Sequence, residues 1–138
     1  MVPLPHIVKS SARWLLAVTM VGVGIAHFAT HDDFVAIMPA FLPLHHELVW
    51  ISGGLEVLGG LGLILPWSRR FAGWGLIALY VCVFPANLNM AINQIGMGGA
   101  EPVVWMLWAR LPFQAVFIVW AYWVSRPDPL VRSVGEGT

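Results

Sequence analysis

The chain has 138 residues, of which 59% are hydrophobic and 10% charged, with a formal net charge of zero. Soluble domains carry about 25% charged residues, so this composition indicates lipid rather than water as the main solvent. Seven Lys and Arg residues without a basic stripe do not provide the positive surface that nucleic acid binding requires. The single cysteine, Cys82, excludes an internal disulfide and a thiolate-rich metal site, and we expect it to be a buried small hydrophobe.

Four apolar runs follow one another, after a short interfacial lead-in at residues 1–10. They cover residues 11–30, 48–66, 70–93 and 102–124, each near the roughly 20 residues that cross a hydrocarbon core. Backbone groups in lipid must be satisfied within their own segment, and no alternation of period two supports strands. The sequence therefore predicts an all-α membrane protein, with residues 1–138 forming one antiparallel bundle of four transmembrane helices.

The first run also has features of a signal peptide, because Lys9 and Arg13 precede an apolar stretch of moderate length. No small-residue cleavage pattern follows it, and His27 interrupts it, which favours an uncleaved span. After this span, residues 31–47 form an outer loop with acids and histidines but no Lys or Arg. Asp32 or Asp33 could cap a short helix there, and the apolar middle of the loop favours a position along the membrane surface.

The cations at or beyond the ends of the spans predict the orientation of the chain. They fall at the N-terminus, in the second loop and at the C-terminus: Lys9, Arg13, Arg69, Arg70, Arg126 and Arg132. The first and third loops have none. By the positive-inside rule, both termini are cytoplasmic (N-in/C-in).

Two opposite charges lie inside the spans. Glu56 is roughly 13 Å and Arg110 roughly 12 Å from the outer ends of the second and fourth spans, at 1.5 Å per residue. An unpaired charge at such a depth would cost several kcal/mol or change its protonation state. We therefore expect a Glu56–Arg110 pair, either direct or through one intermediary.

Three further polar side chains fall in the same outer half: His27, Asn87 and Gln114. All four spans then contribute to one polar layer, which predicts a shared site. Separate hydrogen bonds that merely hold the helices together are the alternative. Pro85 and Pro112 each remove a helical hydrogen bond near this layer, and the glycines around Glu56 are expected to permit close helix packing.

The histidines offer weak metal candidates. His27 and His31 are four residues apart, so they present two imidazoles on one helical face, and His45 and His46 lie on the same side of the membrane. The Glu of a His-Glu-x-x-His motif is missing. We expect no metal, with His31, His45 and His46 as solvated loop residues.

Short motifs recur in order along residues 14–124. They are Gly24-Ile25-Ala26-His27-Phe28, Pro39-x-Phe41-x-Pro43, Ser52-Gly53-x-x-Glu56-x-x-Gly59-Gly60, Arg69-Arg70-x-Ala72, Phe84-Pro85-Ala86-Asn87 and Trp108-x-Arg110-Leu111-Pro112-x-Gln114. With this set the chain resembles the DoxX and DoxX-like family of small four-helix membrane proteins. The resemblance implies the cytoplasmic (inner) membrane of a bacterium, and relatives that are subunits of quinone-linked redox complexes or assembly chaperones.

Two functional hypotheses follow. In the first, the polar layer binds a small lipophilic or redox ligand, with quinone as the candidate cofactor of an oxidoreductase subunit. Glu56 and His27 would then transfer protons, while Arg110, Gln114 and Asn87 bind the ligand. In the second, the protein is a non-catalytic accessory or assembly factor whose polar cluster is structural. Its outer loop would bind a redox or membrane-protein partner, or the protein would form a homo-oligomer within the bilayer.

Overall fold

The computed structural model describes residues 4–127, and this part of the chain contains five helices and no strand. The helices are α1 (Leu4–Ala29), α2 (His31–Ala36), α3 (His45–Ile64), α4 (Arg69–Ile92) and α5 (Val104–Ser125). All except α2 are long and apolar enough to cross a membrane. The prediction of an all-helical protein with four membrane-spanning helices is thereby confirmed at this level. Arg132 lies outside the described residues.

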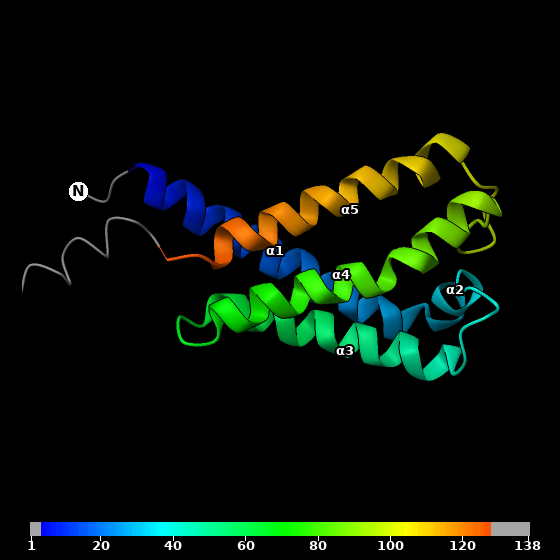
Figure 1. Ribbon diagram of the computed structural model, residues 1–138, viewed down its shortest axis with the longest axis horizontal. Helices are drawn as coiled ribbons and strands as arrows, with labels where there is room; N and C mark the ends of the chain where they lie inside the picture. Colours follow the sequence, from blue (N-terminus) through cyan, green and yellow to red (C-terminus); the bar gives the residue numbers. More distant parts are fainter. Residues whose placement is uncertain (1–3, 128–138) are drawn as a thin grey trace, which may run out of the picture.

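The two ends of the bundle consist of different elements (Figure 1). The α3–α4 connection lies at the end where α1 begins and α5 finishes, and we call this the basic end because it carries Lys9, Arg13, Arg69, Arg70 and Arg126. The helix α2 and the α4–α5 connection lie at the opposite end, which we call the α2 end. Around the bundle, α1 packs on α3, α3 on α4, α4 on α5 and α5 on α1. The helices α3 and α5 are therefore diagonal to each other.

Two clusters of buried side chains fill the bundle. One joins all four long helices and consists of Leu16, Ala17, Met20, Leu63, Leu76, Tyr80, Ala121 and Val124. The other lies toward the α2 end and consists of Ile37, Ala86, Met90, Ala91 and Leu107. Large apolar side chains also cover the outside, including Phe71, Val119 and Leu58. Helices that are apolar on all faces are typical of membrane spans, because lipid contacts the side that the core does not.

The helix α1 begins at Leu4, so the described part of the predicted lead-in is helical and continuous with the first span, and its position at the membrane interface stays a prediction. Lys9 and Arg13 lie inside this helix, and both are buried. Lys9 Nζ donates to the carbonyl of Arg126 at 2.8 Å, and Arg13 Nε donates to the carbonyl of Val124 at 3.0 Å. The last carbonyls of a helix have no intrahelical partner and attract cations. The two residues thus satisfy the end of α5.

The outer loop contains the predicted short helix, α2, but its start differs from the prediction. Thr30 occupies the N-cap position, and Asp32 and Asp33 lie within the first turn. Carboxylates at this place are favoured by the positive end of the helix dipole. The helix α3 starts at His45, three residues before the predicted span, after Leu44 with a positive φ of 57°.

The prediction of a buried Cys82 is wrong, because its side chain is exposed on the outside of α4. Tyr80, two residues earlier, faces the core and is 7% exposed. Two residues along a helix correspond to a rotation of about 200°, so the positions lie on opposite faces. Hydropathy alone does not distinguish the two faces of a span.

Arg69 is the cation that closes α3. Its Nε donates to the carbonyl of Leu63 at 3.0 Å, and its Nη2 donates to that of Ile64 at 3.3 Å. Arg69→Gln is expected to lower the free energy of unfolding by about 1–2 kcal/mol, because charged hydrogen bonds to helix-end carbonyls are lost. Arg70→Gln is the matched control, since Arg70 is exposed and next in sequence. Equal losses in the two variants, measured by reversible unfolding in mixed micelles, would contradict the assignment.

Candidate functional site

A cavity of about 290 Å³ lies between the helices, and residues of all five helices line it. Its wall includes every polar residue of the predicted layer: His27, Glu56, Asn87, Arg110 and Gln114. Members of both buried clusters also contribute, so the cavity separates them. Aromatic side chains from α2 and α5, Phe34, Phe113 and Phe117, complete the wall. Four long helices thus bring their polar groups to one place.

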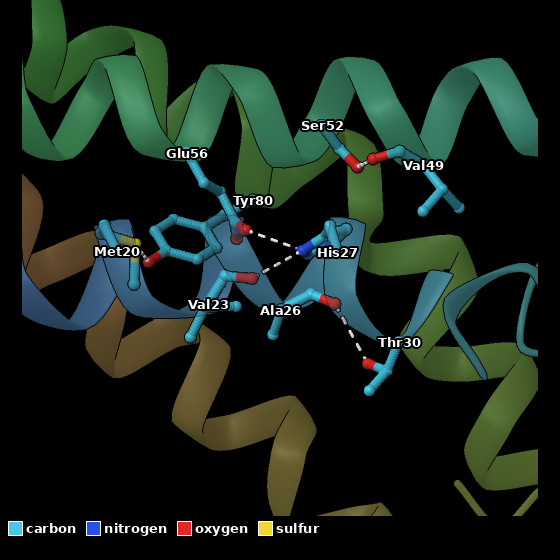
Figure 2. A network of polar contacts seen from close by, with 9 residues as sticks. All are labelled: Met20, Val23, Ala26, His27, Thr30, Val49, Ser52, Glu56 and Tyr80. Carbon is cyan, nitrogen blue, oxygen red and sulfur yellow. Dashed lines mark hydrogen bonds and ion pairs between the residues drawn. The ribbon is translucent and has the colours of Figure 1, made fainter. Parts of the chain in front are cut away.

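Glu56 on α3 and His27 on α1 point toward each other (Figure 2). His27 Nδ1 lies 3.1 Å from Glu56 Oε2 and 3.0 Å from the carbonyl oxygen of Val23. Both residues are 7% exposed. A carbonyl oxygen only accepts, so Nδ1 carries a hydrogen, which it directs toward Val23. Among the described residues, Glu56 Oε2 receives no aligned hydrogen bond, although it is buried. The imidazole of His27 is therefore close to this oxygen, and the oxygen can still accept a hydrogen bond from another group.

The predicted direct pair between Glu56 and Arg110 is wrong. Within residues 4–127, the ion pair of Glu56 is with His27, and Arg110 Nη2 lies 3.8 Å from Met97 Sδ. The reason is the order of the helices. Because α3 and α5 are diagonal, the two charges lie across the cavity instead of side by side. Contact through an intermediary stays a prediction.

Gln114 and Asn87 bond to each other. Asn87 Nδ2 donates to Gln114 Oε1 at 3.2 Å, and Gln114 Nε2 donates to the carbonyl of Tyr80. Both the oxygen and the nitrogen of the Gln114 amide therefore form hydrogen bonds with residues of α4. This geometry favours a role in joining α4 to α5, and ligand binding by these two residues stays a prediction.

The sequence analysis missed Tyr80, Ser52 and Phe34, which also line the cavity. Tyr80 precedes Asn87 by seven residues, and Ser52 precedes Glu56 by four, so helical spacing places each on the same face as its partner. The Tyr80 hydroxyl donates to Met20 Sδ at 2.6 Å. Phe34 stacks on His27 with 3.8 Å between ring centroids, so α2 covers the imidazole. No signal in the sequence pointed to this last contact.

The outer histidines attach the loop to α3, and His45 and His46 differ from the prediction because they begin α3 instead of lying in the loop. His46 is exposed, in agreement with the expected solvated residue. His31 Nε2 and His46 Nδ1 are 2.9 Å apart, and His31 also stacks on Trp50. His45 Nε2 donates to the carbonyl of Pro39 at 3.0 Å. In the described part of the chain, no three His, Cys, Asp or Glu side chains form a group that could hold a metal ion. His27 and His31 are therefore occupied by other contacts.

A family model described as Domain of unknown function (DUF8561) matches residues 16–125. The match covers most of the chain, which therefore belongs to this family. Comparisons with curated proteins and with solved structures found no match. The resemblance to DoxX is wrong, because the matching family is a different one. The motifs that suggested the resemblance consist mainly of glycines, prolines and single polar residues. Helix packing favours such residues in any small membrane bundle.

Proposed function

We propose that this DUF8561 protein binds a small lipophilic molecule with a hydrogen-bonding head in the cavity beside Glu56. One observation carries the proposal: Glu56 Oε2 is buried at the cavity wall and accepts no hydrogen bond from residues 4–127, and Arg110 borders the same cavity. A buried carboxylate without a donor is costly, and a ligand hydroxyl or amine would remove that cost. Arg110 offers N–H groups to a ligand carbonyl or anion.

The cavity has the composition of a ligand site. It is mainly apolar, with a few polar groups that converge from different helices, and this combination fixes the orientation of a bound molecule. A volume of about 290 Å³ is about twice that of a cavity that holds one benzene molecule. The head of the ligand is therefore about the size of one substituted ring.

The proposal includes no electron transfer. Quinone as a cofactor depended mainly on the resemblance to DoxX, which the family match overturns. Proton transfer by Glu56 and His27 stays a prediction. Binding of a phenol, an alcohol or an amine needs only the donor and acceptor positions described above. A quinol belongs to the same chemical group and is one of the ligands to test.

The binding test compares two carboxylates of α3. Purified protein in detergent is titrated with phenols, aromatic amines and short-chain quinols, with calorimetry and thermal shift as the measurements. Glu56→Gln is expected to weaken the binding of the best ligand about tenfold or more, since a charged hydrogen bond contributes about 1.5–3 kcal/mol. Glu47→Gln is the control, because Glu47 is exposed and does not line the cavity. Equal affinities for all three proteins would refute the proposal.

We also propose an antiparallel arrangement across the membrane, with both termini and the basic end in the cytoplasm, from the positive-inside rule. The α2 end then faces outward. A bacterial cytoplasmic membrane as the location depended on the mistaken resemblance and is not part of this proposal.

Two equally exposed aromatic residues test the orientation. Phe41 near the α2 end and Trp67 at the basic end are each 78% exposed. In a Cys82→Ala background, Phe41→Cys is expected to react with an impermeant maleimide in intact cells, because it faces outward. Trp67→Cys should react only after lysis. The reverse pattern would place the termini outside.

The second candidate is an accessory protein without a ligand, and the Gln114 contacts favour it, because they join two helices. In this alternative, the exposed residue Phe41 and its neighbours in the outer loop bind a partner protein. It predicts that Glu56→Gln changes stability but that no ligand of the panel binds.

A further inference from the structure

A second cavity adjoins the first on the side of α5. It has a volume of about 340 Å³ and lies between the α4–α5 connection and the first turns of α5. Arg110 and Phe113 belong to the walls of both cavities. The two cavities therefore meet at these two residues.

The side chains of these two residues are weakly held. Arg110 is exposed, and its guanidinium contacts the thioether of Met97 at 3.8 Å, a weak acceptor. Phe113 is 61% exposed. Both can change rotamer without breaking a strong hydrogen bond. A continuous space then extends from Glu56, past Arg110, to the α4–α5 connection.

The wall of the second cavity indicates what it would hold. Apart from Arg110 its charged member is Glu101, and the remainder is mainly apolar, including Met97, Met106 and Ala109. A carboxylate at this place repels an anionic group, so an uncharged apolar chain fits best. The polar groups of the ligand belong in the first cavity and at Arg110.

We infer that the two cavities form one elongated binding site, and that Arg110 lies at its midpoint. The inference rests on the proposed function and names its ligand class: a molecule with a hydroxyl head, then a ring with a carbonyl on its far side, and then an uncharged apolar tail. The hydroxyl donates to Glu56 Oε2. The carbonyl accepts from the Arg110 guanidinium, and the tail extends over Phe113 into the second cavity.

Alkyl esters of 4-hydroxybenzoic acid carry these groups in this order, so methyl and hexyl 4-hydroxybenzoate are the probes. Ala109→Phe places a ring in the second cavity alone, because Ala109 lines that cavity and not the first. It is expected to raise the ratio of the hexyl to the methyl Kd about tenfold or more, as a close-packed wall rejects added bulk. Binding of the methyl ester should persist and shows that the variant is folded.

Ala115→Phe is the matched control. Ala115 lines a different groove on α5, so the same added ring leaves the ratio unchanged. Partition of the esters into the micelle does not affect the comparison of this Kd ratio between variants, because it is the same for every variant. If Ala109→Phe does not fold, Ala109→Leu is expected to change the ratio in the same direction by a smaller factor.

Three results are distinguishable. A ratio raised by Ala109→Phe but not by Ala115→Phe supports the elongated site. Equal ratios in all proteins, with binding that still depends on Glu56, overturn the elongated site and leave the proposed function intact. Failure of both esters to bind, while another ligand of the panel binds through Glu56, overturns the ligand class named here.

Discussion

Replacing Gly53 by alanine is expected to lower the free energy of unfolding by about 1–3 kcal/mol, the usual cost of overpacking a close contact. A Cβ at this position would lie 2.6 Å from His27 Cβ and 3.0 Å from the carbonyl oxygen of Gly24. Neither atom is at the end of a flexible side chain, so α1 itself would have to move away from α3. Because α1 carries His27, the variant should also weaken ligand binding.

Gly54→Ala is the control next in sequence. A Cβ at Gly54 meets no described atom within 4 Å. The expected change is a small gain, up to about 1 kcal/mol, since alanine loses less backbone entropy than glycine in a helix. Reversible unfolding in mixed micelles measures both variants. Similar stability changes at the two positions would show that the α1–α3 contact does not depend on Gly53.

The four spans and the polar layer were predictable because lipid imposes strong constraints on sequence. A helix must supply about 20 apolar residues, and a polar group among them is costly enough to be noticed. His27, Glu56, Asn87, Arg110 and Gln114 were found on this ground, and all five line one cavity. Depth along each helix follows from a fixed rise per residue, so their common level could be estimated.

The pairing of these residues was not predictable, because depth does not give the order of helices around a bundle. Glu56 and Arg110 match in depth and charge, but their helices are diagonal, and the neighbouring α1 supplies His27 instead. The glycines indicated only in part which helices pack closely together. Gly24 and Gly53 lie against each other, and a Cβ on Gly24 would be 2.7 Å from Gly53 O. Small residues on two spans mark a close contact, but not which spans form it.

The last prediction separates a binding site from a structural ion pair. The double variant His27→Leu with Glu56→Met replaces the pair by apolar side chains of similar size. Burying two ionisable groups costs free energy, and replacing such a pair by well-packed apolar residues often raises stability by about 1–4 kcal/mol. We expect a gain in the free energy of unfolding together with loss of ligand binding. This result would mean that the pair is kept at the expense of stability, as residues of binding sites often are.

The single variant His27→Leu provides the comparison. It leaves Glu56 buried without its ion-pair neighbour, so it should lower the free energy of unfolding by about 1–3 kcal/mol. If the free energy of unfolding falls in the single variant and rises in the double variant, the loss of stability comes from the Glu56 carboxylate that is buried without a partner. If the double variant is also less stable than the unmodified protein, the pair stabilises the bundle. The accessory function would then be the better explanation, because the site would have a structural purpose without any ligand.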